Sequence, residues 1–273
     1  MATTAESSRD LAYRGRGRGR GIRTIPEGLT GPLRRPNVNV GNEESRQTLE
    51  EVTRRMQLAT METIEEDATQ VINMVRNYSV TGKDLQEVAS KFYKVTLDNS
   101  KYGIVAAELA KRMANFEVEG AKFRNLILKL LQSDFIKRDV LRRDSMNQWL
   151  GFVTFLIELL AVLRTQSGDI LKALLKPSFV SLTELLTSTD DTLLAEEELE
   201  HCVGVLKRRG QFLQEQDTAS MECLMKALRD KILDVQTSAY GRCLLLELLE
   251  MSCRGWGLSD DIKEYYKETI TRH

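Results

Sequence analysis

Few residues in this chain have the types and spacing that catalysis or metal binding requires. The sequence holds two histidines, and His273 is its last residue. His201 and Cys202 are adjacent and Cys223 follows, but tetrahedral zinc needs four converging ligands and no fourth stands at a recognisable spacing. We therefore expect His201, Cys202 and Cys223 to be helix-packing residues, and we predict neither a metal site nor a cofactor.

Two other patterns match catalytic motifs only in part. Residues 80–84 read Val-Thr-Gly-Lys-Asp, whereas a phosphate-binding loop needs a hydroxyl residue in place of Asp84 and a glycine in place of Asn77. Glutamates within 196–200 precede the basic residues 207–209, an order that the dipole of a single helix favours. We predict that the protein is not an enzyme. Convergent acid and base groups in a polar pocket would support the opposite interpretation.

The clearest binding signal is an alternating Arg-Gly run at residues 14–21. Each guanidinium can contact a phosphate or stack on a base, and the glycines leave the backbone free to adapt. We predict sequence-tolerant, salt-sensitive RNA binding; a solvated or methylated tail, or one that binds proteins, is the alternative. The predicted RNA contacts are Arg14, Arg16, Arg18, Arg20 and Arg23.

A second basic cluster lies between residues 122 and 143, where Asp134 and Asp139 are the only acidic residues. It could form a nucleic-acid surface, but a long helix also exposes some charge as a plain solvent-facing stripe. Its candidate RNA contacts are Lys122, Arg124, Lys129, Lys137, Arg138, Arg142 and Arg143.

Three aromatic residues stand out near the end of the chain. Trp256 lies between Gly255 and Gly257, where the backbone can turn sharply. The adjacent Tyr265 and Tyr266 point about 100° apart on a helix, so at least one should reach the surface. Core packing is the default interpretation, and we predict that these aromatics anchor a protein partner.

The composition predicts one folded domain and one tail. Residues 1–42 contain three of the four prolines, seven of the 17 glycines and neither Phe nor Trp, so they bury too little apolar area to order themselves. Eight Arg against three acidic residues give this segment a charge of +5, and the other 31 basic and 37 acidic residues give −6. We predict a disordered Arg-Gly tail at 1–42 and a helical module at 43–273.

The same composition bounds the compartment. No apolar run approaches the roughly 20 residues of a membrane span, and the N-terminus has no apolar stretch of the secretory kind. The four cysteines form no CxxC pair, as is usual in a reducing compartment. We expect a cytoplasmic protein that could also enter the nucleus and that does not bind membranes.

After residue 42, apolar positions recur at helical spacing, and strands find no support. Later pairs begin near 102, 145, 193 and 238, close to the ~40 to 47 residue period of HEAT and armadillo units. The fold is therefore predicted as an all-α, HEAT-like α-solenoid of about five antiparallel pairs, with a globular bundle as the alternative. The expected pairs are 45–78 with 83–97, 102–115 with 119–140, 145–164 with 169–187, 193–215 with 218–234, and 238–254 with 259–270. Ser167 is expected to cap the helix at 169.

Several segments resemble a known family. They read FRNLIL at 123–128, QWLGFVTF at 148–155, LLLELLE at 244–250 and RGW at 254–256, followed by paired tyrosines. Over about residues 50–270 the chain is similar to the middle-domain family of the translation-initiation scaffold, the initiation factor 4-gamma middle domain. The similarity is closest to its small single-domain branch, which includes the partner of the histone-mRNA stem-loop-binding protein.

This resemblance implies a solenoid of HEAT-like pairs that connects messenger ribonucleoproteins with the translation machinery. Relatives bind DEAD-box helicases or the nuclear cap-binding complex, or pair with themselves. The implied partners are translation-initiation factors or a DEAD-box helicase, cap- or mRNA 3'-end-binding proteins, and a second copy in a homodimer. We predict a non-catalytic adaptor in mRNA translation or turnover that binds these proteins and RNA. The alternative is a general helical-repeat scaffold without RNA binding.

Overall fold

The described part of the chain is one compact helical unit. A computed structural model describes residues 40–187 and 192–271, and the segment from Val40 onward clusters as a single unit. Residues 1–39 of the predicted tail lie outside the described residues. Helix α1 begins at Val40, so the last three residues assigned to the tail belong to a helix. No helix in the described ranges is long and apolar enough to cross a membrane.

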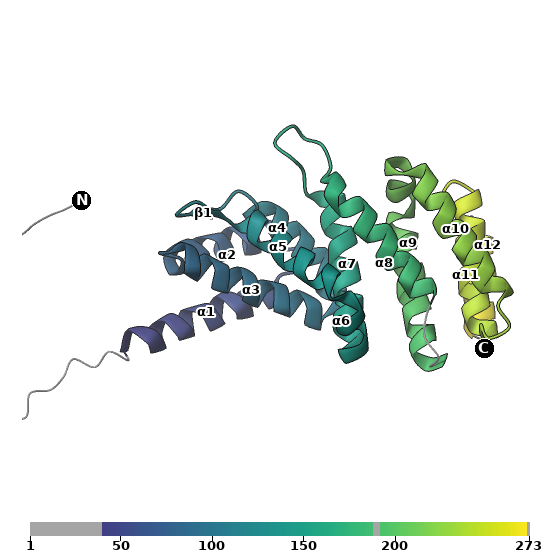
Figure 1. Ribbon diagram of the computed structural model, residues 1–273, viewed down its shortest axis with the longest axis horizontal. Coiled ribbons are helices and arrows are strands. Elements are labelled where there is room, and N and C mark those ends of the chain that lie inside the picture. The colour runs from purple at the N-terminus through teal and green to yellow at the C-terminus, as the bar shows by residue number, and fades with distance from the viewer. Residues whose placement is uncertain (1–39, 188–191, 272–273) are drawn as a thin grey trace, which may run out of the picture. The chain divides into compact units, whose positions relative to one another are not determined.

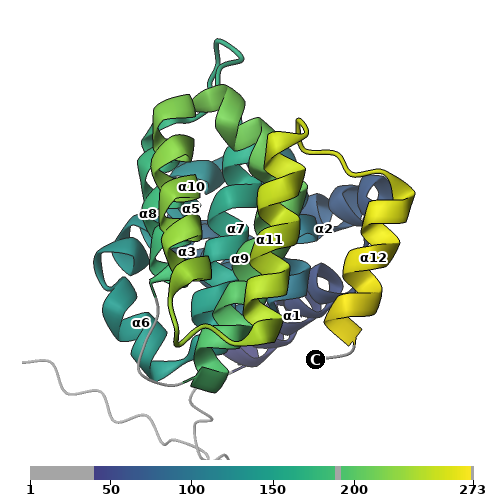
Figure 2. The same ribbon diagram turned by 90° about the vertical axis from the view of Figure 1, so that its right-hand side faces the viewer.

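The unit consists of two layers of stacked helices (Figure 1). One layer holds α1, α3, α5, α8 and α10, and the other holds α2, α4, α7, α9 and α11, while α12 packs on α11 beyond the fifth pair (Figure 2). This arrangement confirms the predicted all-α solenoid. The helices are α1 (Val40–Leu58), α2 (Ile64–Tyr78), α3 (Gly82–Asp98), α4 (Gly103–Met113), α5 (Phe123–Ile136), α6 (Arg138–Asp144), α7 (Met146–Val162), α8 (Leu175–Leu186), α9 (Thr192–Gln216), α10 (Thr218–Leu233), α11 (Ala239–Cys253) and α12 (Asp260–Thr271), with 3-10 turns η1 (Ser100–Tyr102) and η2 (Lys172–Leu174).

The helices pair in a different register from the one predicted. The single helix expected over 45–78 is two helices, α1 and α2, joined by a turn at residues 59–63. The Thr63 backbone N–H donates to the Thr60 hydroxyl (3.3 Å), which replaces a helical hydrogen bond in the turn. The turn contains neither Gly nor Pro, so the composition carries no sign of it. The pairs consequently begin at residues 40, 82, 123, 175 and 218, and α12 is an additional helix.

The expected helix start at residue 169 is wrong. Helix α8 begins at Leu175, after a loop in which Arg164 and Ile170 form an isolated β-bridge. Ser167 donates to the Asp169 carboxylate (2.7 Å) inside this loop and does not cap a helix. Side chain to side chain bonding of this kind lets short polar residues stabilise turns in place of helix.

The start of the helix expected over 119–140 also differs. Residues there form a short hairpin of β1 (Glu117–Val118) and β2 (Ala121–Lys122), although no strand was expected. Glu119 and Gly120 both have positive φ, 49° and 80°, as a two-residue hairpin turn requires. The remaining segment then divides at Lys137 into α5 and α6.

Helix α7 forms the centre of the core. Every residue from Trp149 to Leu160 is buried, and α7 packs on α3, α4, α8 and α9. The Ser145 hydroxyl caps its start by accepting from the Gln148 N–H (3.4 Å). A Cβ at Gly151 would lie 2.3 Å from the Leu97 carbonyl oxygen, so glycine permits the close approach of α3. The sequence prediction of an inner-layer helix here is confirmed.

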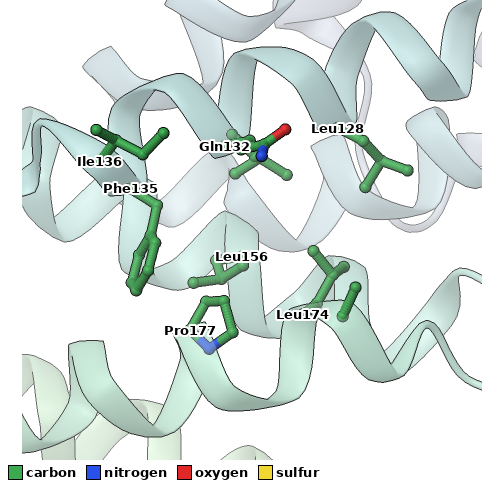
Figure 3. A pocket seen from close by; sticks show the side chains of 9 residues that line it. Leu128, Gln132, Phe135, Ile136, Leu156, Leu174 and Pro177 are labelled. Atoms are coloured by element: carbon green, nitrogen blue, oxygen red, sulfur yellow. The ribbon is translucent and has the colours of Figure 1, made fainter.

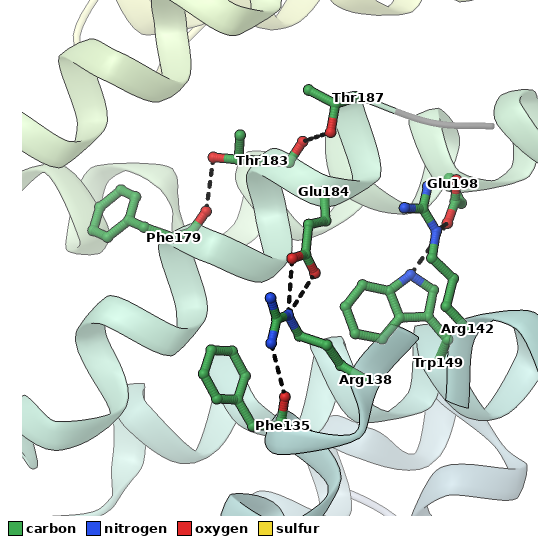
Figure 4. A network of polar contacts seen from close by, with 9 residues as sticks. All are labelled: Phe135, Arg138, Arg142, Trp149, Phe179, Thr183, Glu184, Thr187 and Glu198. Atoms are coloured by element: carbon green, nitrogen blue, oxygen red, sulfur yellow. Dashed lines mark hydrogen bonds and ion pairs between the residues drawn. The ribbon is translucent and has the colours of Figure 1, made fainter. Parts of the chain in front are cut away.

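A buried carboxylate joins α6 and α7 to α9. Arg142 makes two hydrogen bonds of 2.6 Å to the Glu198 carboxylate, and the Trp149 indole N–H donates to the same group (3.2 Å; Figure 4). The Glu198 side chain is fully buried. Burial raises the pKa of Glu198, and the hydrogen bonds from Arg142 and Trp149 oppose that shift. The geometry is the bidentate arrangement that suits an arginine–carboxylate pair.

A second buried carboxylate lies on α7 itself. Glu158 accepts from Arg208 (3.3 Å) and Arg209 (2.7 Å) of α9. The predicted explanation for the charges of α9, an acidic start and basic end that match the helix dipole, is therefore wrong for Glu198, Arg208 and Arg209. These residues form ion pairs with neighbouring helices.

We predict that Arg142→Ala lowers the free energy of unfolding by about 3 to 5 kcal/mol, because it leaves Glu198 buried without its cation. Urea denaturation followed by circular dichroism measures the change. Arg54→Ala is the control, because Arg54 forms an exposed pair with Glu51, and such pairs contribute about 0 to 1 kcal/mol. Equal losses in the two variants would contradict a structural role for the buried pair.

Candidate interaction groove

An apolar groove lies between α5 and α8 (Figure 3). Its volume is about 380 Å³, and Gln132 is its only lining residue with a polar side chain. Ile136 at its edge is 70% exposed, and Val140 one turn later is also exposed. An apolar hollow bordered by exposed aliphatic side chains is a typical docking feature. The lining residues are Leu128, Leu131, Gln132, Phe135, Ile136, Leu156, Ala173, Leu174 and Pro177.

The groove exists because one helix layer is interrupted. Helix α3 packs on α5 and α8 packs on α10, but α5 and α8 have no comparable contact. The chain between them contains α6, α7, a loop and η2, so the step from the third to the fourth pair is longer than the others. Pro177 lies in the first turn of α8, where its missing N–H costs no helical hydrogen bond, and its ring faces Leu156.

Arg138 on α6 connects the two sides of the groove. Its Nε donates to the Glu184 carboxylate of α8 at 2.8 and 3.1 Å, and another guanidinium nitrogen donates to the Phe135 carbonyl (3.1 Å; Figure 4). The guanidinium carbon also lies 4.8 Å from the centre of the Phe135 ring. Arg138 therefore positions Phe135, a groove residue, relative to α8.

The border of the groove is basic. Four exposed lysines directly adjoin lining residues in the sequence: Lys129, Lys137, Lys172 and Lys176. The carboxylates of the same elements have other partners, because Glu184 pairs with Arg138 and Asp134 interacts with Tyr93 of α3. Apolar contacts inside and uncompensated cations outside favour a ligand with apolar side chains and negative charge.

The predicted basic cluster of residues 122–143 does not form one surface. Arg138 and Arg142 are used in ion pairs between helices, and Lys122 pairs with Glu117 of the hairpin (3.3 Å). Lys129 and Lys137 border the groove, Arg143 is exposed on α6, and Arg124 lines a separate pocket at the end of α4. RNA binding by these residues stays a prediction, as it does for Arg14, Arg16, Arg18, Arg20 and Arg23, which lie outside the described residues.

The C-terminal aromatics have three different environments. Trp256 has φ of 66° and packs on α9, where a Cβ at Gly210 would lie 1.9 Å from its ring, and its indole N–H donates to Gln214 (2.7 Å). Tyr266 donates to Glu250 (3.0 Å) and is half-buried, whereas Tyr265 is 63% exposed. The expectation that one tyrosine reaches the surface is confirmed. Partner binding by Trp256, Tyr265 and Tyr266 stays a prediction.

The residues considered for metal binding are packing residues. His201 hydrogen-bonds through Nε2 with the Thr154 hydroxyl (2.7 Å), and Cys202 is fully buried. Cys223 is exposed on α10. In the described ranges, no three His, Cys, Asp or Glu side chains gather as a metal site. Burial and the nearby Arg208 charge lower the pKa of His201 to about 4.

The sequence analysis missed the groove residues. Leu128, Leu131 and Phe135 fit the apolar stripe of an ordinary helix, so nothing in the helical period separates a groove from a core. Pro177 was a usable signal, because it is the only proline after residue 42 and it lies inside a predicted helix. A helix that starts late at this proline would have indicated a gap beside α5.

The fold and groove define a helical-repeat scaffold protein with an open apolar docking site. The MIF4G domain matches residues 47–252, and the chain belongs to that family. It is 35% identical over 189 residues to the CBP80/20-dependent translation initiation factor of Xenopus tropicalis, covering 69% of this chain and 32% of that protein. The chain therefore spans about a third of the length of this relative.

Shorter relatives match over most of their length. MIF4G domain-containing protein B of Danio rerio is 31% identical over 192 residues, which cover 69% of this chain and 85% of the relative. The human MIF4G domain-containing protein is 30% identical over 196 residues, with the same two coverages. These matches confirm the predicted resemblance to the middle-domain family and its small single-domain branch.

We predict that His201 makes folding less stable at acidic pH. Its pKa is near 6.5 when unfolded and about 4 when folded, so its contribution is complete above about pH 6.5 and is lost as the pH falls toward 4. The loss amounts to roughly 3 kcal/mol. Urea denaturation of wild type and His201→Gln between pH 7 and pH 4 measures it, because other titrating groups cancel in the difference. Parallel stability curves for the two proteins would contradict the prediction.

Proposed function

We propose that this protein is a non-catalytic adaptor in mRNA translation or turnover and that the groove between α5 and α8 is its main protein-binding site. The groove carries the proposal, because it combines exposed apolar side chains with an interrupted helix layer. Its occupant is an acidic segment of a partner protein that inserts apolar side chains. The four bordering lysines supply the complementary charge, which sets register and association rate more than affinity.

The family gives the biological setting of this proposal. The chain belongs to the MIF4G family, and its Xenopus relative is named for translation initiation and for dependence on CBP80/20. We propose the corresponding partners here: translation-initiation factors or a DEAD-box helicase, and cap- or mRNA 3'-end-binding proteins. The proposal places the protein in the cytoplasm, with a further pool in the nucleus.

A second protein-binding surface is centred on Tyr265. Its ring is exposed and meets Tyr266 edge to face, with ring centres 5.4 Å apart. Tyrosine is a favoured interface anchor because it offers a rigid apolar ring with a polar tip. This surface is the candidate for self-association, and its contribution is separable from that of the groove by mutation.

We predict that Ile136→Glu strongly reduces partner binding and leaves folding intact. The side chain is largely exposed, so its replacement costs little stability, but a carboxylate at the groove edge repels an acidic ligand. The expected loss is at least tenfold, or roughly 1 to 2 kcal/mol. Affinity capture from nuclease-treated cytoplasmic extract, quantified for initiation factors and cap-binding proteins, measures it.

Matched variants decide between the possible surfaces. Val80→Glu changes another exposed aliphatic residue, on the α2–α3 turn, and should bind as wild type does. Charge reversal of Lys129, Lys137, Lys172 and Lys176 should reduce capture more than reversal of Lys83, Lys91, Lys94 and Lys226, which are also exposed. If Tyr265→Ala abolishes capture and Ile136→Glu does not, the groove is not the main site.

We predict that replacing Arg14, Arg16, Arg18, Arg20 and Arg23 by Ala weakens RNA binding without changing the melting temperature. Mobile cations release counterions from RNA but bury nothing. The slope of log affinity against log salt for an oligouridylate should fall by up to about 3. An unchanged slope in fluorescence anisotropy titrations would show that the tail is not the contact, and the alternative of a scaffold without RNA binding would then stand.

A further inference from the structure

A polar pocket at the opposite side of α5 from the groove border has its own chemistry. Its volume is about 570 Å³, and it lies where the end of α4, the start of α5 and the end of α7 meet. Lys111, Arg124 and Arg164 supply cations from these three places, and Asn115 and Gln166 add amides. None of the lining residues is acidic. The loop after α7 projects beyond the helices at this edge (Figure 1).

The cations of the pocket are positioned by the fold. One terminal nitrogen of Arg164 donates to the Leu163 carbonyl (3.0 Å), which leaves the other N–H groups of the guanidinium available. The Arg124 backbone N–H donates to the Ala114 carbonyl (3.4 Å), and this bond fixes the start of α5 against the end of α4. Lys111 shares its ammonium with Glu108 (3.1 Å), so Arg124 and Arg164 carry most of the uncompensated charge.

We propose that this pocket binds a phosphodiester of single-stranded RNA. Guanidinium groups match phosphate geometry, and Val162 and Leu163 offer apolar contact to a ribose or base beside the amides. The inference rests on the RNA-binding part of the proposed function and gives the folded module a contact of its own, separate from the Arg-Gly run. RNA is favoured over a phosphorylated peptide because the same chain carries that run.

The test compares two double variants of the full chain. Arg124→Gln with Arg164→Gln removes the two free cations of the pocket, whereas Lys129→Gln with Arg143→Gln removes two exposed cations outside it. Binding of a fluorescent ten-residue oligouridylate is measured by anisotropy from 50 to 300 mM salt. The pocket variant should bind about tenfold more weakly at 150 mM salt, and its salt slope should fall by about 2, one for each lost phosphate contact.

Three controls define the outcomes. Arg124→Gln alone, which keeps the hydrogen bond of Arg164 to its carbonyl, should lose about half of that slope, so a folding defect cannot explain the result. Ile136→Glu should leave RNA affinity unchanged, which separates this inference from the groove proposal. Wild-type affinity and slope in the pocket variant, an equal loss in the Lys129 and Arg143 control, or stronger binding of a phosphoserine peptide than of RNA would each overturn it.

Discussion

The arrangement of the third and fourth helix pairs depends on two arginines of the short helix α6. Arg138 pairs with Glu184 of α8, and Arg142 pairs with the buried Glu198 of α9. Since a buried carboxylate without its cation is strongly destabilising, these pairs fix α6 across the junction. The junction keeps α7 and α9 in contact while α5 and α8 stay apart, and the apolar groove occupies the space between them.

The architecture was largely predictable because burial leaves a periodic trace. The apolar residues of α7 and the family segments at 123–128 and 148–155 indicated stacked helix pairs, and the structure has them. The break at residues 59–63 was not predictable from composition, because threonine hydroxyls replace the helical hydrogen bonds without Gly or Pro. Missing this one break shifted the register of every later pair.

The interaction sites were predicted less well, because side-chain type does not reveal its partner. Arg138 and Arg142 have the composition of a nucleic-acid surface, yet their partners lie 46 and 56 residues further along the chain. Trp256 resembled an exposed anchor, but a glycine on α9 admits its ring. The exposure of Tyr265 was predictable, since adjacent helical positions cannot both face one core stripe.

The central claim is that the α5–α8 groove is where a translation partner docks. Photo-crosslinking from a benzophenone amino acid at Gln132, the polar residue inside the groove, tests this claim in cytoplasmic extract. The matched position is Lys91, an exposed residue of α3. The account predicts a crosslink to an initiation factor or cap-binding protein from position 132, competed by excess wild-type protein, and none from position 91. Crosslinks from position 91 alone, or equal crosslinks from both positions, would contradict it.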